Sequence, residues 1–291
     1  MAHNSTTDYC FLGKSGLKVS NVCLGSLTFQ KIDEGLGANS SPTQLKTEED
    51  VYKLLDRFVE LGGNFIDTAN IYGKGRAETM IGNWLSKKNR DDVVIASKVR
   101  FRMSDKPNDI GLSRRHIMQS VEESLKRLQT DYIDLYQAHM WDSATPIEET
   151  FRAFDDLVRC GKIRYIGVSN LNGWRLQKVV DTIKYAGMNP VVSLQQQYSL
   201  LCRYPEFEEL EVCTNEGIGV IPWSPLKGGL LTGKYKRGEV PDPNTTRIGH
   251  VAKDEKRLIQ LSAPAWSSYS DNDNYWKIID KLSSISKKHG L

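Results

Sequence analysis

Four residues with acid–base side chains stand at or just beyond the ends of apolar, β-rich runs of the sequence. They are Asp67 and Tyr72 in NFIDTANIYG, Lys98 in VVIASKV and His139 in DLYQAHM. An ammonium group beside a tyrosine favours the phenolate and brings its pKa down from about 10 towards neutrality. A carboxylate beside the lysine keeps that ammonium charged and oriented. Together the four residues predict a proton-donating group in which Tyr72 is the general acid.

Each of these residues taken singly also has a structural interpretation. Asp67 could cap a helix, and Tyr72 could belong to the core. Lys98 could point to solvent, and His139 could be a satisfied core histidine. The functional interpretation therefore depends on a fold that brings all four side chains to one place.

Short β-rich runs alternate with amphipathic stretches at a spacing of roughly thirty residues, as βαβ units do. The predicted strands are Val22–Leu27, Asn64–Ala69, Val93–Val99, Tyr132–Met140, Ile163–Asn170, Val191–Gln197 and Ile218–Ser224. Gly217 is the expected turn before the last of them.

Helical patterns lie between these runs, with apolar residues recurring every three or four positions. The first follows a Thr47–Asp50 capping signal and precedes Gly62, and another begins behind Ser113. The stripes are Val51, Leu54, Leu55, Phe58 and Val59; Ala77, Met80, Ile81, Trp84 and Leu85; Ile117, Val121, Leu125 and Leu128; Ile147, Phe151, Phe154 and Leu157; and Leu176, Val179, Val180 and Ile183. We interpret these stripes as core contacts.

This alternation fits either an open, doubly wound parallel sheet or a closed barrel. The turn after the first run, LGSLTFQ, lacks the GxGxxG pattern that brings backbone against a pyrophosphate in the open fold. A barrel places all its strand C-termini on one rim, where functional side chains converge. We therefore expect an α/β fold, a (β/α)8-type TIM barrel, with residues 1–291 forming a single domain.

The composition of the chain limits the kinds of molecule that it is expected to bind. The chain has 291 residues, of which 39% are hydrophobic, and a net charge of +3 that is too small to indicate nucleic acid. The five cysteines are far apart and show no metal-ligand spacing, which favours reduced thiols. No signal peptide or membrane-spanning run is recognisable, so we expect a cytoplasmic protein.

The sequence resembles the aldo-keto reductase superfamily from LGKSGLKVSNVCLGS through PWSPLKGGLLTGKY. NFIDTANIYG, ASKV, DYIDLYQAH, GKIRYIGVSN and LQQQYSLL occur in the family's order and spacing. The branch that is most similar contains potassium-channel β-subunits, aflatoxin aldehyde reductases and bacterial aryl-alcohol or sugar reductases. The resemblance implies that Asp67, Tyr72, Lys98 and His139 are the catalytic tetrad.

The resemblance also implies an NADPH site. Asn170 and Gln195 would hydrogen-bond the nicotinamide carboxamide together with Ser169, while Trp223 would stack on the ring. The structural alternative is that these residues cap helices at the rim, and for Ser169 alone we favour it. The remaining expected cofactor contacts are Ser26, Leu27 and Asp67 near the first strands; Ser224, Pro225, Leu226, Gly228 and Lys234 in a pyrophosphate-binding loop; and, as a weaker candidate, Arg247.

Two further expectations concern segments outside the barrel strands. Residues from Lys31 to Lys46 and from Leu226 to about Asn274 are predicted to be long loops that act as lids or linkers. The family continues beyond SISKKHGL with an eighth βα unit, so we expect that unit to be missing. The first and seventh strands would then have exposed edges, and the chain would bind NADPH poorly and be marginally stable.

The function implied is NADPH-dependent reduction of a small aldehyde or ketone without a metal. The alternatives are a regulatory subunit that binds the cofactor with little turnover and an inactive truncated isoform. His139 favours the enzyme, because the channel subunits depart from the tetrad at that position. The sequence does not identify the substrate, the stereochemistry or the oligomeric state.

Overall fold

A computed structural model describes residues 8–29, 47–252 and 265–290 of the chain. Its sheet has seven parallel strands in chain order, each hydrogen-bonded to the next. The strands are β3 (Cys23–Gly25), β4 (Phe65–Asp67), β5 (Val94–Val99), β6 (Ile133–Ala138), β7 (Ile163–Ser169), β8 (Val191–Gln197) and β9 (Gly219–Trp223). All seven predicted strands are confirmed, although several are shorter than expected at one or both ends.

The sheet is curled into a barrel. Asp67 on β4 and Gln195 on β8 are four strand positions apart, which in a flat sheet would separate them by roughly 19 Å. The Nε2 of Gln195 nevertheless donates a hydrogen bond of 2.8 Å to Oδ1 of Asp67. The fold is therefore a (β/α)8-type barrel of which the described residues supply seven strands, and no described strand pairs with the outer edges of β3 and β9.

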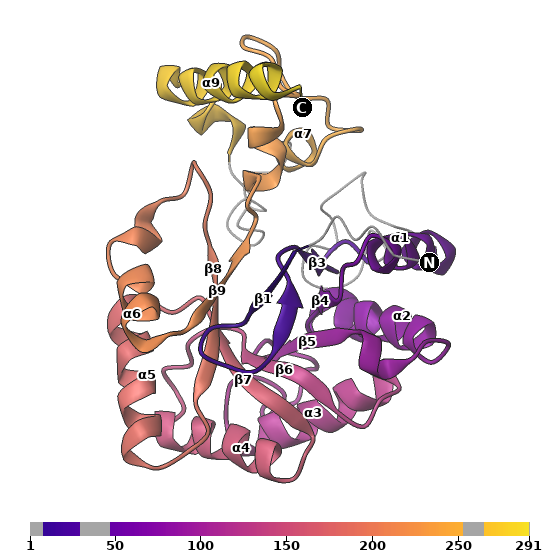
Figure 1. Ribbon diagram of the computed structural model, residues 1–291, viewed down its shortest axis with the longest axis vertical. Helices are drawn as coiled ribbons and strands as arrows, with labels where there is room; N and C mark the ends of the chain where they lie inside the picture. Colours follow the sequence, from indigo (N-terminus) through magenta and orange to yellow (C-terminus); the bar gives the residue numbers. More distant parts are fainter. Residues whose placement is uncertain (1–7, 30–46, 253–264, 291) are drawn as a thin grey trace.

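Helices follow the strands and surround the sheet (Figure 1). They are α1 (Glu48–Glu60), α2 (Arg76–Leu85), α3 (Arg114–Leu128), α4 (Ile147–Arg159), α5 (Gly173–Tyr185) and α6 (Glu209–Glu216), with short 3-10 helices η1 (Tyr72–Gly75), η2 (Arg90–Asp92) and η3 (Tyr204–Glu206). The predicted caps are confirmed: Thr47 accepts from the N–H of Asp50, and Ser113 from that of His116. The sequence reading missed α6, whose apolar stripe is weak and whose buried residues are only Glu209 and Cys213.

The N-terminal hairpin closes the bottom of the barrel. Strands β1 (Tyr9–Phe11) and β2 (Lys18–Ser20) pair antiparallel. Leu12 and Val19 pack inside the barrel with Phe65, Val94 and Ile221. Gly13 has φ +58° and lies so close to the backbone of Gly217 and Gly219 that a Cβ would clash. The catalytic residues predicted from sequence lie on β4, β5 and η1 and directly after β6, towards the opposite end.

The segment after β9 differs from the predicted long loop. Its described part contains η4 (Lys227–Thr232), α7 (Arg247–Ala252) and η5 (Trp266–Ser268), followed by α9 (Asp273–His289). These elements lie away from the ring of barrel helices in Figure 1. They share a hydrophobic cluster of Leu230, Tyr235, Ile248, Trp266, Tyr275, Trp276 and Ile279. The sparse aromatic residues between glycines and prolines therefore form a packed cluster, which composition alone did not reveal. The other predicted loop, Lys31–Lys46, lies outside the described residues.

Candidate active site

Lys98 is the centre of a buried polar group inside the barrel. Its side chain is fully buried, and its Nζ donates to Oδ2 of Asp67 at 2.6 Å and to the carbonyl of Thr68 at 2.8 Å. The same Nζ lies 3.3 Å from the hydroxyl of Tyr72. The structure thus brings together the Asp67, Tyr72 and Lys98 side chains that the sequence singled out, and excludes the solvent-exposed alternative for Lys98.

His139 completes the group through ring contacts. It directly follows β6, and its ring lies edge-on to that of Tyr72, with 5.9 Å between centroids. The ring of Phe101 contacts its other side at 4.8 Å. Its Nδ1 is buried and has no hydrogen-bond partner among the described residues. The phenol and the imidazole are therefore neighbours beside the Lys98–Asp67 ion pair, close enough for both to contact one small molecule.

Electrostatics set the protonation of these groups. Burial raises the pKa of Tyr72 above its ordinary value, although the charge of Lys98 lowers it. Burial lowers the pKa of Lys98, but the charges and hydrogen bonds of Asp67 and Tyr72 outweigh this and raise its pKa overall. Burial, together with the charges of Lys98 and Arg100, holds the pKa of His139 well below its ordinary value. At neutral pH the site therefore contains a phenol, an ammonium and a neutral imidazole.

This corrects one expectation. Lys98 was expected to bring the pKa of Tyr72 towards neutrality, and its effect does have that direction. The desolvation of the buried phenol is larger, so the net shift is upwards. Sequence gives the identity of neighbours but not the depth at which a group is buried.

The depressed pKa of His139 predicts a pH-dependent stability. The unfolded chain takes up a proton on this imidazole below pH of about 6.5, while the folded chain does not until lower pH, so folding loses stability as pH falls through that interval. Urea unfolding at pH 7.5 and 5.5 should show a smaller loss for His139→Gln than for the unmodified chain. The difference is at most about 1.4 kcal/mol per pH unit. The exposed His289 supplies the control, because His289→Gln should lose as much stability as the unmodified chain. Equal losses in both variants would contradict the prediction.

Two residues that the sequence reading missed hold the group in place. Gln137, on the same strand face as His139, donates from Nε2 to Oδ1 of Asp67 at 3.2 Å. This placement could have been predicted, because side chains two positions apart in a strand lie on the same face. Glu78 is fully buried on α2 and accepts from Ser97, the neighbour of Lys98, at 2.5 Å. It also accepts from Arg127 at 2.8 Å.

The predicted cofactor residues fall into two sets. Near the tetrad, Ser26 is buried, its N–H donates to the Asp67 carbonyl, and Leu27 packs on the core. Asn170, with φ +56°, donates to the carbonyl of His139 at 3.0 Å and to Ser169 at 2.8 Å. Trp223 donates from Nε1 to Oδ1 of Asn170 at 3.0 Å. The Asn170 and Gln195 amides are thus engaged with protein groups, and a bound carboxamide would have to replace some of these bonds.

The second set lies beyond β9. Ser224, Lys227, Gly228 and Gly229 all have positive φ, and a Cβ on Gly229 would lie 3.2 Å from Nζ of Lys234. Leu226 and Pro225 are exposed at the start of this loop. Burial lowers the pKa of Arg247, and its buried Nε has no hydrogen-bond partner among the described residues. A guanidinium so desolvated fits an anionic partner such as a phosphate.

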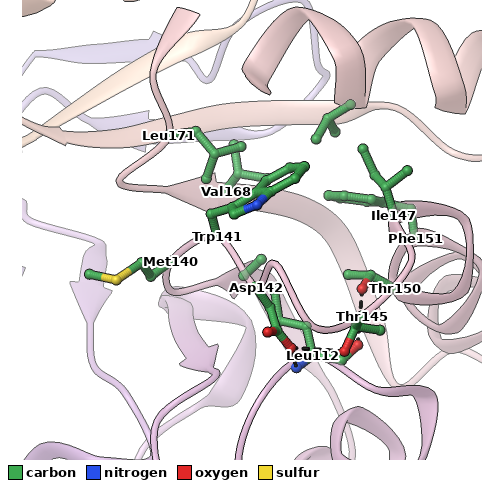
Figure 2. Close-up of a pocket in the computed structure, with 12 residues that line it drawn as sticks. Leu112, Met140, Trp141, Asp142, Thr145, Ile147, Thr150, Phe151, Val168 and Leu171 are labelled. Carbon is green, nitrogen blue, oxygen red and sulfur yellow. Dashed lines mark hydrogen bonds between the residues drawn. The ribbon is translucent and has the colours of Figure 1, made fainter. Parts of the chain in front are cut away.

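A separate cavity beside the site has a different character. Figure 2 shows Trp141 pointing into it between Leu171 and Val168 on one side and Ile147 and Phe151 on the other. Asp142 at its edge accepts from the N–H of Leu112 at 2.7 Å and from Thr145 at 2.8 Å. The lining is apolar and its one carboxylate is engaged, so this space belongs to the packing between the sheet, α4 and α5.

The described part of the chain does not support a metal site, a disulfide or a membrane-spanning helix. No group of three or more His, Cys, Asp or Glu side chains there is placed to hold a metal ion. The five cysteines are free. None of the described helices is long and apolar enough to cross a membrane.

A parallel barrel with a buried lysine–aspartate–tyrosine group defines a β/α-barrel protein with an acid–base site at one end. The family model described as "Aldo/keto reductase family" matches residues 34–291, and the chain belongs to that family. This membership makes it an oxidoreductase.

Three relatives illustrate the range of the family. An "uncharacterized oxidoreductase" of Bacillus subtilis is 39% identical over 265 residues, covering 88% of this chain and 77% of that protein. A "versiconal hemiacetal acetate reductase" of Aspergillus parasiticus is 33% identical, with coverage of 98% and 82%. A "probable voltage-gated potassium channel subunit beta" of Arabidopsis thaliana is 39% identical, with coverage of 80% and 68%.

Proposed function

We propose that this protein reduces an aldehyde or ketone to the alcohol, with NADPH as the hydride source and Tyr72 as the proton donor. The observation that carries the proposal is the contact of 3.3 Å between the Tyr72 hydroxyl and Nζ of the buried, ion-paired Lys98. A carbonyl oxygen that gains electron density needs a proton, and a buried phenol backed by a fixed cation can deliver one.

Each residue of the tetrad has a role in this proposal. Tyr72 donates its proton to the developing alkoxide, and Lys98 stabilises the phenolate left behind. Asp67 keeps Lys98 charged and is itself held by amide donors from Gln137 and Gln195. His139, neutral because of its depressed pKa, donates a hydrogen bond to the carbonyl oxygen and orients it.

The expected cofactor residues also have separate roles, according to whether they lie near the tetrad or beyond β9. NADPH, when bound, supplies the hydride. Asn170, Ser169 and Gln195 would hold its carboxamide beside Trp223, with Ser26, Leu27 and Asp67 near the ring. Ser224, Pro225, Leu226, Gly228 and Lys234 would hold the pyrophosphate. The unpartnered Nε of Arg247 supports a contact with the phosphate on the adenosine ribose, which NADPH carries and NADH lacks.

A screen of NADPH oxidation against aldehydes, ketones and sugars tests the proposal. We expect the loss of NADPH to match the alcohol formed. Tight NADPH binding with no turnover on any carbonyl would instead support a regulatory role, of the kind suggested by the name of the channel-subunit relative. We also propose that the protein acts in the cytoplasm on small molecules.

Trp223 gives a test of cofactor binding that does not depend on turnover. Trp223→Ala should weaken NADPH binding about tenfold, since an aromatic contact contributes about 0.5–1.5 kcal/mol beyond its buried area. It should also remove most of the tryptophan quenching that NADPH causes. Trp174, which is 55% exposed at the start of α5, provides the matched control. Quenching that persists in Trp223→Ala and disappears in Trp174→Ala would show that Trp223 is not the stacking residue.

A further inference from the structure

Arg100 is a cation beside the candidate active site that the proposed reaction does not use. It directly follows Val99, the last residue of β5, and is two residues after Lys98. Its guanidinium carbon lies 5.6 Å from the centroid of the Phe101 ring, and that ring lies 4.8 Å from His139. The cation is therefore one aromatic ring away from the imidazole that faces Tyr72.

Arg100 has no matching carboxylate. It takes part in none of the ion pairs between described residues. Its buried Nε has no hydrogen-bond partner there either. The charge of Asp142 interacts with it, but that carboxylate accepts hydrogen bonds from Leu112, Ala144 and Thr145 of its own region. Lys98, in contrast, is neutralised by Asp67.

Apolar side chains follow both this cation and His139 in the sequence. Phe101 and Met103 are partly buried against the core, and Met140, next to His139, is 38% exposed. Met140 also lines the cavity into which Trp141 points (Figure 2). Burial is the main cause of the lowered pKa of His139, and the charges of Lys98 and Arg100 add to it in the same direction. An apolar surface with one unmatched cation favours a ligand that is apolar with one negative end.

We propose that Arg100 is a specificity residue that selects carbonyl substrates carrying a carboxylate on an aromatic or similarly flat apolar body. The inference rests on the proposed reduction and deepens it. With the carbonyl at Tyr72 and His139, the body of the substrate lies along Phe101 and its carboxylate reaches the Arg100 guanidinium. The backbone of Arg100 is fixed independently of its side chain, because its carbonyl accepts from the N–H of Gly111 at 2.8 Å.

Two matched substrates test this proposal with NADPH: 4-carboxybenzaldehyde, and its neutral methyl ester, methyl 4-formylbenzoate. The readout is the ratio of kcat/KM for the acid to that for the ester. Arg100→Gln should lower this ratio about tenfold to a hundredfold, as expected when a hydrogen bond between charged groups is lost. Arg100→Lys should retain part of the ratio. Arg102→Gln removes the same charge from an exposed neighbour and should leave the ratio as in the unmodified protein.

The outcomes separate this inference from the proposed function. An unchanged ratio in Arg100→Gln, or the same fall in Arg102→Gln, would overturn the role of Arg100 while leaving carbonyl reduction intact. If the unmodified protein reduces neither compound, reduction itself is in doubt, and calorimetric binding of 4-carboxybenzyl alcohol decides about Arg100. Binding that Arg100→Gln abolishes supports the inference, and binding that is absent or unaffected by the substitution overturns it.

Discussion

Tyr72→Phe is expected to lower kcat for carbonyl reduction by about a hundredfold to ten-thousandfold, the range for loss of a general acid. The substitution removes only the hydroxyl that lies 3.3 Å from Nζ of Lys98, and the ring can keep its edge contact with His139. NADPH binding should therefore remain nearly intact. Steady-state rates together with a cofactor titration measure the two effects separately. Equal activity in the two proteins would exclude Tyr72 as the proton donor.

The second large effect is expected for Lys98→Met. Lys98 lowers the pKa of Tyr72, so its loss raises that pKa further and makes the phenol a weaker acid. Turnover should fall, and the alkaline decline of any residual reduction should move to higher pH. The rate of reduction measured from pH 7 to 11 would show both changes. An unchanged rate and pH profile would contradict the assignment.

The same substitution should also destabilise the fold. It leaves the carboxylate of Asp67, whose side chain is 11% exposed, without its ammonium partner. Breaking such a buried pair costs about 3–5 kcal/mol in the free energy of unfolding. The double variant Asp67→Asn with Lys98→Met provides the control, because it removes the orphaned charge as well. We expect it to recover much of the stability but none of the activity.

The sequence predicted the barrel because the relevant signals are local. Alternating apolar runs, the caps at Thr47 and Ser113 and the lack of GxGxxG each depend on a few neighbouring residues. Since the C-terminal ends of parallel strands share one rim, the convergence of Asp67, Lys98 and His139 followed from their places at strand ends.

The features that could not be predicted from the sequence depend on contacts between residues far apart in the chain and on how deeply each side chain is buried. Glu78 reads as one more charge on a helix, yet it is fully buried between Ser97 and Arg127. Arg100 reads as a residue after a strand, and only the fold shows that the Phe101 ring beside it contacts His139 and that Arg100 forms none of the ion pairs between described residues. The upward shift in the pKa of Tyr72 has the same origin, because desolvation is a property of the folded chain.

The hairpin beneath the barrel has a consequence for the order of folding. The N–H of Lys14 donates to the carbonyl of Gly217 at 2.7 Å, so the hairpin turn is joined to the residues just before β9 by a contact between positions far apart in the sequence. During synthesis the hairpin leaves the ribosome long before Gly217 and Gly219 exist, so it can contact Phe65 and Val94 early, but the Gly217 and Gly219 part of its docking surface is missing until β9 forms. A side chain at position 13 would clash with the backbone of Val192, Gly217 and Gly219. Gly13→Ala would therefore obstruct the last closure while leaving the earlier βα units free to assemble.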